Sequence, residues 1–330
     1  MKIIKLPSTK QFVTLLFFTF GALAFGQQAI HQVSLEHLKS HLKILSSDAM
    51  AGRETGTPGI EKAAKYLESE FLRLGLTPLH SKSFRQVYKL PNSEGKACNI
   101  IAQIEGKSIP SEFVVVSAHY DHLGIGNGEI YNGADDDGSG TAALLAMAEK
   151  LMELKKQGKG PVRTVVFIAF SGEEKGLWGS DYFSEHPTLD LTKVSCDVNI
   201  DMIGRIDPDR TTADTNHYVC VVGQRHISSE LKLALRALNE NTQNLILDGK
   251  FDEQSDPNRI FYRSDHYNFA KKGVPAVFFY DGMLGGDYHE PTDDFEKIDW
   301  DVYQKRCNFI LDFVVSVANR ADLLKRDLTE

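Results

Sequence analysis

The sequence is poor in cysteine. It has four in 330 residues, Cys98, Cys196, Cys220 and Cys307, and no two of them stand in a CxxC spacing. A zinc site built from thiolates is therefore not expected. An oxidising compartment would permit disulfides, but buried free thiols explain the four residues equally well. The sequence indicates no pairing.

Other features are scarce as well. Positive charge is outweighed, with 37 lysines and arginines against 45 aspartates and glutamates, so nucleic acid is not an expected partner. There is no GxSxG segment, which would form the nucleophile turn of a serine hydrolase. Repeats, low-complexity tracts and linkers are absent, and the length suits one large domain or two small ones. We therefore expect a single domain over residues 27–330.

Residues 1–26 have the pattern of a secretory signal peptide. Three lysines lie in the first ten residues, an apolar run covers 12–25, and small residues stand at Ala24 and Gly26. The run is short for a membrane span, and no cysteine follows it, which argues against a lipoprotein. We expect cleavage before Gln27, export to the periplasm or the extracellular space, and no stable membrane insertion afterwards.

Hydrophobic periodicity predicts that strands alternate with helices. Continuous apolar runs such as 165–170 are typical of buried strands, and Pro58 and Gly75 mark the ends of a long amphipathic helix. The alternation predicts an α/β fold with a largely parallel central sheet. We expect 241–263 to be an irregular surface loop. The expected strands are 76–87, 99–105, 113–117, 165–170, 194–200, 218–222 and 274–279; the expected helices are 33–45, 58–74, 139–154, 176–183, 228–238, 265–270 and 301–318.

The stretch 117–140, SAHYDHLGIGNGEIYNGADDDGSG, is the richest in polar side chains. A predicted strand brings His119 and Asp121 to its carboxyl end, and a glycine-rich loop leads to three aspartates at 135–137. Four carboxylates and two histidines at the mouth of a buried strand repel one another and lose hydration unless positive charge is present. Zinc accepts imidazole and carboxylate ligands, so the stretch predicts a divalent metal site.

Similar residues follow other predicted strands. Each alone has an ordinary explanation as a capping or solvated side chain. However, the functional crevice of an open α/β sheet lies at the carboxyl ends of its strands, where all of these residues meet. They are Glu173 and Glu174 after 165–170, Asp201 after 194–200, and Asp281 and His289 after 274–279.

Several segments together resemble the secreted di-zinc aminopeptidase family, in a clan that also holds glutamate carboxypeptidase and the glutaminyl cyclases. They are SAHYDHLG, NGADDDGSG, SGEEKGLWGS, NIDMIG, RSDHYNFAKKGVPAVFF and DYHEPTDD, in the family's order. The resemblance implies a three-layer αβα architecture around a mostly parallel mixed sheet, the zinc-exopeptidase (phosphorylase/hydrolase-like) fold. It also implies two zinc ions as cofactors and peptides as substrates.

The resemblance assigns a metal-binding role to five residues. His119 and Asp201 would bind the first zinc, and Glu174 and His289 the second. Asp136, which stands four residues before Gly140, would bridge the two. Independently of the resemblance, two zinc ions that share a water would lower its pKa towards neutrality and stabilise a tetrahedral oxyanion.

Three further residues have supporting roles by the same resemblance. Glu173 would be the general base, which takes a proton from water and passes it to the leaving amine. Asp121 would orient the imidazole of His119. Asp137 would support the bridging carboxylate, and the family often has a cis peptide bond between the two aspartates. His122, His226 and His266 are expected to be structural or surface residues.

The wall of the site is less well defined by the sequence. The family implies that the segment around Asp265 lines the site. Tyr262 is either an oxyanion donor or a packed aromatic. Arg205 and Arg263 are placed to bind a substrate carboxylate or to form salt bridges on the cleft wall. The consecutive residues 264–266, Ser-Asp-His, are not expected to form a nucleophilic triad, because neighbours in sequence rarely meet in that geometry.

The sequence therefore favours a zinc-dependent exopeptidase, and in particular an aminopeptidase. The alternatives are a carboxypeptidase or dipeptidase, a glutaminyl cyclase, and a binding protein on the same scaffold. Cyclase relatives have a shorter, less acidic pattern around the bridging aspartate, and binding proteins lose metal ligands, whereas this chain keeps both features. The chain is also short for the extra domains of the large carboxypeptidases. The preferred side chain, the native metal and the oligomeric state are not indicated.

Overall fold

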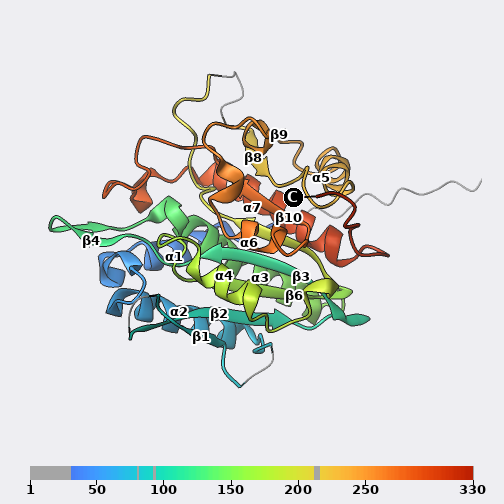
Figure 1. The fold of residues 1–330 in the computed structure, drawn as a ribbon, viewed down its shortest axis with the longest axis horizontal. Coiled ribbons are helices and arrows are strands. Elements are labelled where there is room, and N and C mark those ends of the chain that lie inside the picture. Colours follow the sequence, from blue (N-terminus) through green and yellow to red (C-terminus); the bar gives the residue numbers. More distant parts are fainter. Residues whose placement is uncertain (1–30, 80–81, 92–93, 212–215, 330) are drawn as a thin grey trace, which may run out of the picture.

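The protein is built around one eight-stranded mixed sheet. The structure, a computed structural model, describes residues 31–79, 82–91, 94–211 and 216–329, so the expected signal peptide lies outside the described residues. In Figure 1 the two strands at one edge of the sheet lie at one end of the molecule, and the two strands at the opposite edge lie at the other end. In spatial order the strands are β1 (Arg85–Lys89), β2 (Lys96–Ile104), β6 (Arg163–Phe170), β3 (Ile109–His119), β7 (Val194–Ile200), β10 (Ala276–Tyr280), β8 (Tyr218–Val222) and β9 (Ile246–Asp248).

The four central strands, β6, β3, β7 and β10, are parallel to one another. Their carboxyl ends therefore lie at one edge of the sheet. On either side the pairing becomes antiparallel, between β2 and β6 and between β10 and β8. Every residue of β6 and β7 is buried, as expected of parallel strands that are covered on both faces. The predicted α/β fold with a mostly parallel mixed sheet is confirmed.

Helices cover both faces of the sheet, which gives three layers. Alternate residues of a strand point to opposite faces: Val114 and Val116 pack in one core, and Val115 packs in the other. The first core includes α1 (Leu35–Leu45), α2 (Pro58–Leu74), α3 (Gly140–Lys156), α5 (Leu231–Asn239) and α7 (Trp300–Ala318), and the second includes α4 (Trp178–Glu185) and α6 (His266–Ala270).

Two segments differ from the expectation based on sequence. Of the edge strand expected over 76–87, only β1 forms, and Thr77 makes an isolated bridge to Gln103. The expected loop 241–263 contains the short strand β9 and two helical turns. In both cases the elements are too short for periodicity to reveal.

A small hairpin was also not anticipated. It consists of β4 (Gly124–Gly126) and β5 (Glu129–Tyr131), and it projects from the body of the molecule in Figure 1. Asn127 and Gly128 form its turn, both with positive φ, which is the conformation of tight hairpin turns. The hairpin lies between the two halves of the stretch that predicts the metal site.

The four cysteines are all buried and unpaired. They lie in β2, β7, β8 and α7, at Cys98, Cys196, Cys220 and Cys307. The structure thus agrees with the interpretation of these residues as free thiols.

Arg53 connects the loop before α2 to the edge of the sheet where the metal site is expected. Its side chain is 1% exposed. It donates hydrogen bonds to the carbonyl oxygens of Tyr120 at 3.0 Å, Leu45 at 2.7 Å, Asn132 at 2.7 Å and Gly133 at 2.9 Å. Because buried carbonyl groups need donors, this one guanidinium stabilises several irregular segments at once.

We expect Arg53→Met to lower the free energy of unfolding by about 3 kcal/mol or more, because buried carbonyls would lose their donors. Urea denaturation measures this loss. Arg73→Met is the matched control, since Arg73 makes a surface ion pair with Glu70 at 2.7 Å, a kind of contact worth less than about 1 kcal/mol. Equal losses in the two variants would contradict the role of Arg53.

Candidate metal centre

Acidic and imidazole side chains meet at the carboxyl edge of the central strands. The structure brings together all five predicted metal ligands and the predicted base, although they come from distant parts of the chain. They are His119 at the end of β3, Asp136 in the turn before α3, Glu173 and Glu174 after β6, Asp201 after β7, and His289 in the loop after β10. All except Glu174 line one pocket.

His119, Asp136 and Asp201 form the first half of the centre. His119 Nε2 lies 3.2 Å from Asp136 Oδ1 and 3.5 Å from Asp201 Oδ1. Burial alone would lower the pKa of His119, but the charges of Glu173 and Asp201 outweigh it and raise that pKa well above its ordinary value. This half of the centre therefore favours a positive charge.

Asp136, Glu174 and His289 form the second half. His289 Nε2 lies 3.2 Å from Asp136 Oδ2 and 3.0 Å from Glu174 Oε2. Burial opposes protonation of His289, but its hydrogen bonds to Asp136 and Glu174 raise its pKa to about 10. Asp136 turns one carboxylate oxygen to each half, which is the arrangement a bridging ligand needs.

The spacing of the donor atoms suits zinc. Ligand atoms at ~2.0–2.2 Å from a tetrahedral zinc ion stand roughly 3.3–3.6 Å from one another. In both halves, the imidazole nitrogen is 3.0 to 3.5 Å from its carboxylate oxygens. Each half offers one imidazole and two carboxylates, which leaves a coordination position for water or substrate. The residues therefore fit a pair of metal ions.

Asp137 is close to the first half, but its carboxylate already has partners. It lies near enough to His119 to be a candidate ligand. However, it accepts hydrogen bonds from the backbone N–H groups of His119 at 3.1 Å, Gly140 at 2.8 Å and Met202 at 3.2 Å. It therefore holds three segments together, and Asp136 is the better ligand. The peptide bond between the two aspartates is cis, as the family resemblance implies.

Asp293 fixes the bridging turn, and the sequence alone did not identify it. Its carboxylate accepts hydrogen bonds from the backbone N–H groups of Asp135, at 2.9 and 3.0 Å, and Asp136, at 3.0 Å. It stands next to Asp294 in the segment DYHEPTDD, and nothing in the spacing distinguishes the two.

Asp121 supports both His119 and Glu173. His119 Nδ1 lies 3.2 Å from the backbone oxygen of Asp121 and 3.6 Å from its carboxylate Oδ1. The same carboxylate accepts hydrogen bonds from the backbone N–H of Glu173 at 3.2 Å and the hydroxyl of Thr55 at 3.0 Å. Asp121 is thus placed to orient the imidazole and to fix the loop that carries Glu173.

The adjacent residues Glu173 and Glu174 have different surroundings. Glu173 Oε2 lies 3.9 Å from His119 Nε2. Burial raises the pKa of Glu173 well above its ordinary value, and Glu174 and Asp201 add to the effect. Burial and a neighbouring carboxylate would also raise the pKa of Glu174, but hydrogen bonds to two histidines lower it. Environments that separate two carboxylates in this way suit a proton acceptor next to a metal ligand.

His122 belongs to the site, although the sequence placed it among structural residues. It is fully buried, and its Nδ1 lies 2.7 Å from Glu174 Oε1 and 3.9 Å from Asp136 Oδ2. His289 is nearer to Asp136, at 3.2 Å, and is 38% exposed beside the pocket. The ligand atoms of His122, Asp136 and Glu174 all lie within 4.8 Å of one another, so His122 is a second candidate ligand beside the predicted ligand His289. The position of His122 in the loop after His119 was the only signal in the sequence.

Tyr288 is a second residue that the sequence did not identify. Its ring stacks on that of His289 with the centroids 3.9 Å apart, and it lines the same pocket. Its hydroxyl accepts a hydrogen bond from Arg263 at 2.9 Å. Tyr288 therefore connects a predicted ligand to a predicted wall residue.

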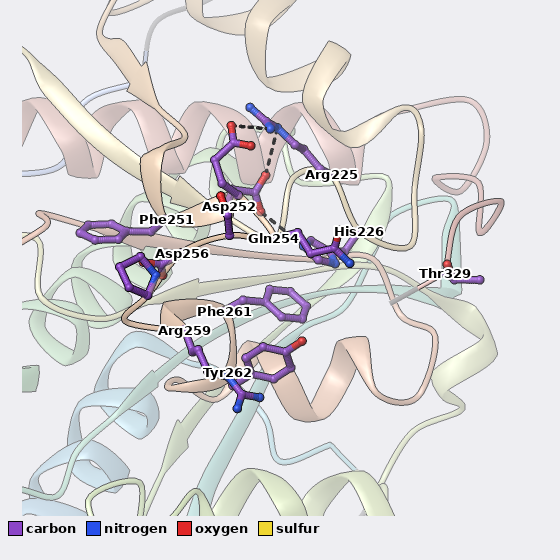
Figure 2. Close-up of a pocket in the computed structure, with 13 residues that line it drawn as sticks. Arg225, His226, Phe251, Asp252, Gln254, Asp256, Arg259, Phe261, Tyr262 and Thr329 are labelled. Atoms are coloured by element: carbon purple, nitrogen blue, oxygen red, sulfur yellow. Dashed lines mark hydrogen bonds and ion pairs between the residues drawn. The ribbon is translucent and has the colours of Figure 1, made fainter.

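Tyr262 lies in a different cleft. That cleft has a volume of about 730 Å³, and Figure 2 shows Tyr262 in it beside Phe261 and Arg259. The ring is 42% exposed, and the guanidinium carbon of Arg259 lies 4.7 Å from its centroid. Tyr262 does not line the metal pocket. The structure therefore gives no support to Tyr262 as an oxyanion donor in the metal pocket.

Neither Ser264 nor Asp265 lines the metal pocket. The hydroxyl of Ser264 donates a hydrogen bond to Asp201 Oδ2 at 2.6 Å. Asp265 is fully buried, and burial raises its pKa to about 7. Because the hydroxyl of Ser264 is committed to a predicted zinc ligand, the structure gives no support to a nucleophilic triad.

Arg205 and Arg263 have different partners. Arg205 donates to Asp287 at 2.9 Å and lies 3.9 Å from Asp293, so it is a salt-bridge residue of the wall. Arg263 lines the metal pocket and donates to the hydroxyl of Tyr288. Among the residues that the structure describes, no carboxylate forms an ion pair with Arg263. Its guanidinium is therefore available to an anionic group in the pocket.

Comparison with known proteins relates the chain to peptidases. Residues 99–314, more than half of the chain, match the model of peptidase family M28. A probable leucine aminopeptidase of Trichophyton verrucosum is 26% identical over 88% of this chain and 75% of its own length.

Solved structures share the fold. A zinc aminopeptidase from Bacillus subtilis matches with a TM-score of 0.69 and 17% identity, over 91% of this chain and 100% of its own. A glutaminyl cyclase from Porphyromonas gingivalis matches with a TM-score of 0.68 and 17% identity, over 86% of this chain and 98% of its own. At these identities the likeness establishes the fold and does not separate peptidase from cyclase.

Proposed function

The chain belongs to peptidase family M28 and is a zinc-dependent exopeptidase, and we propose that it removes N-terminal residues from peptides with the help of two zinc ions. The observation that carries the proposal is the division of one buried cluster into two half-sites that share Asp136. His119 and Asp201 would hold one ion, and Glu174 and His289 the other. Bound zinc would activate a water molecule and polarise the scissile carbonyl.

Glu173 supplies the proton transfer in this proposal. It lines the pocket, and its carboxylate lies beside the first half-site. It would take a proton from the attacking water and deliver it to the nitrogen of the leaving amine, so that the base becomes the acid in the second half of the reaction. Asp121 would act as a positioning residue, because its carboxylate accepts a hydrogen bond from the backbone N–H of Glu173.

The zinc ions of the proposed site would select a substrate amine. Asp136 and Asp201 line the pocket but would be bound to zinc, so a free N-terminal amine would bind one of the ions through its nitrogen. One observation favours a second candidate, a dipeptidase. Arg263 also lines the pocket and has no carboxylate partner among the described residues, and a guanidinium binds the carboxylate of a short peptide well.

We also propose that residues 1–26 direct export and are removed. Within the part of the chain that the structure describes, no helix is both long and apolar enough to cross a membrane. N-terminal sequencing of the mature protein is expected to begin at Gln27. A mature protein that retains residues 1–26 would contradict the signal-peptide assignment.

Matched peptides test the exopeptidase type. The mature protein would be given dipeptides and tripeptides with a free or acetylated amine and a free or amidated carboxyl end, with and without a chelator. We expect hydrolysis that requires the free amine and stops with the chelator. A requirement for the free carboxylate alone would indicate a carboxypeptidase, and a requirement for both ends a dipeptidase. No cleavage with zinc bound would favour the cyclase or the binding protein.

The variant Arg263→Gln tests the dipeptidase with the same peptides. If Arg263 binds a substrate carboxylate, kcat/KM for peptides with a free carboxyl end falls on the order of 10- to 100-fold, and amidated peptides are unaffected. Arg259→Gln is the matched control, because Arg259 lies in the neighbouring cleft. A similar loss for both kinds of peptide would remove this role from Arg263.

Glu173→Gln is expected to retain zinc and lose turnover, because the amide cannot accept the proton. The expected fall in kcat is about 10² to 10⁴-fold. Metal analysis of the purified variants provides the contrast: two equivalents of zinc in the wild type and in Glu173→Gln, and one in His289→Ala. Substantial hydrolysis by Glu173→Gln would refute the assignment of the base.

A further inference from the structure

A continuous chain of hydrogen bonds runs from the middle of the sheet to the predicted zinc ligand Asp201. Asp197 Oδ1 lies 2.8 Å from the hydroxyl of Ser117, which lies 3.0 Å from Asn199 Oδ1. Asn199 Nδ2 donates to the hydroxyl of Ser264 at 2.7 Å. The hydroxyl of Ser264 donates to Asp201 Oδ2 at 2.6 Å.

The register of the sheet explains why these residues meet. Asp197 and Asn199 are two residues apart in β7, so their side chains point to the same face. Ser117 in β3 is the parallel partner of Asn199. The hydrogen-bonded chain thus crosses from β7 to β3 and back within the buried part of the sheet. Asp197, Ser117 and Asn199 have no exposed surface, and Ser264 has 1%.

The number of available protons decides which group donates in each hydrogen bond of this series. Asp201 must be ionised to bind a metal ion, so Ser264 must donate its only proton to it. The oxygen of Ser264 then accepts from Asn199, which points its amide oxygen at Ser117. Because Ser117 has a single proton, its contacts with Asn199 and Asp197 are both hydrogen bonds only if it donates to one and accepts from the other, and the amide oxygen of Asn199 can only accept. The proton between Ser117 and Asp197 can therefore come only from Asp197.

We propose that Asp197 is a protonated carboxylic acid that donates to Ser117 and so orients Asp201 through the hydrogen-bonded chain. This inference rests on the proposed role of Asp201 as a zinc ligand. Asp197 is a positioning residue in this scheme. It makes every donor in the chain point towards the site, so that Asp201 Oδ2 is held by Ser264 and Oδ1 faces His119, 3.5 Å away.

The surroundings of Asp197 are consistent with a neutral acid. It is fully buried, and its Oδ2 has no hydrogen-bond partner. Among the described residues it forms no ion pair. Burial raises the pKa of Asp197 well above its ordinary value. The hydrogen bond with Ser117 acts against this rise, and the nearby charge of Asp265 adds to it. An ionised carboxylate would be costly in this position.

Infrared spectroscopy tests the protonation state directly. Protein labelled with ¹³C at the aspartate carboxyl groups would be compared with the same labelled Asp197→Asn variant at mildly alkaline pH, with and without zinc. We expect the wild type to have a carbonyl band of a protonated carboxylic acid that is missing in the variant. A difference that contains only carboxylate bands would overturn the proposal. This measurement does not depend on peptide hydrolysis.

Zinc affinity tests the positioning role. Asp197→Asn keeps a donor of the same shape and is expected to bind zinc within about twofold of the wild type. Asp197→Val fills the space without a donor and is expected to bind zinc about tenfold more weakly, at the low end of the loss caused by removing a direct partner of a metal ligand. Competition with a chelator measures both affinities.

The outcomes separate the possible roles of Asp197. If Asp197→Asn loses as much affinity as Asp197→Val, the negative charge matters and the proposal is wrong. If neither variant changes the zinc affinity, the hydrogen-bonded chain does not orient Asp201, and the positioning role is wrong. Thermal unfolding identifies a variant that fails to fold, in which case Ser117→Ala replaces Asp197→Val. A wild type that binds no zinc would instead refute the proposed function, and the infrared result would still stand.

Discussion

The other contacts of the site are arranged around the carboxylate of Asp136, which lies between His119 and His289. Each of its oxygens faces one histidine at 3.2 Å, and it is 3% exposed. So much negative charge away from water is stable only beside positive charge. The surrounding structure is arranged to hold this group in place. Asp293 binds the backbone of its turn, and Asp137 joins that turn to the ends of two strands.

The central sheet supplies the rigidity that these contacts need. Four parallel strands end at one edge, so side chains that are far apart in sequence begin from fixed positions. The loops that leave this edge have little regular structure of their own. Buried polar residues such as Arg53 and Asp121 therefore replace the backbone pairing that a strand or helix would provide. The hydrogen-bonded chain from Asp197 extends the same principle into the sheet itself.

The wall of the pocket combines groups of opposite charge. Carboxylates and imidazoles make the inner part, whereas Arg263 and Tyr288 stand together at its side. The neighbouring cleft that holds Tyr262 is separate from this wall, although the two share the turn around Ile260.

The α/β architecture and the segments that hold the predicted metal ligands could be predicted from the amino-acid sequence. Apolar runs and glycine-rich loops report these features locally, and motifs such as NGADDDGSG are specific in combination. The partners of the individual side chains, in contrast, depend on the folded structure. It placed His122 against Glu174, committed Arg205 to a salt bridge and put Tyr262 in another cleft. The direction of a side chain in an irregular loop depends on contacts with distant segments, and no pattern along the chain records those contacts.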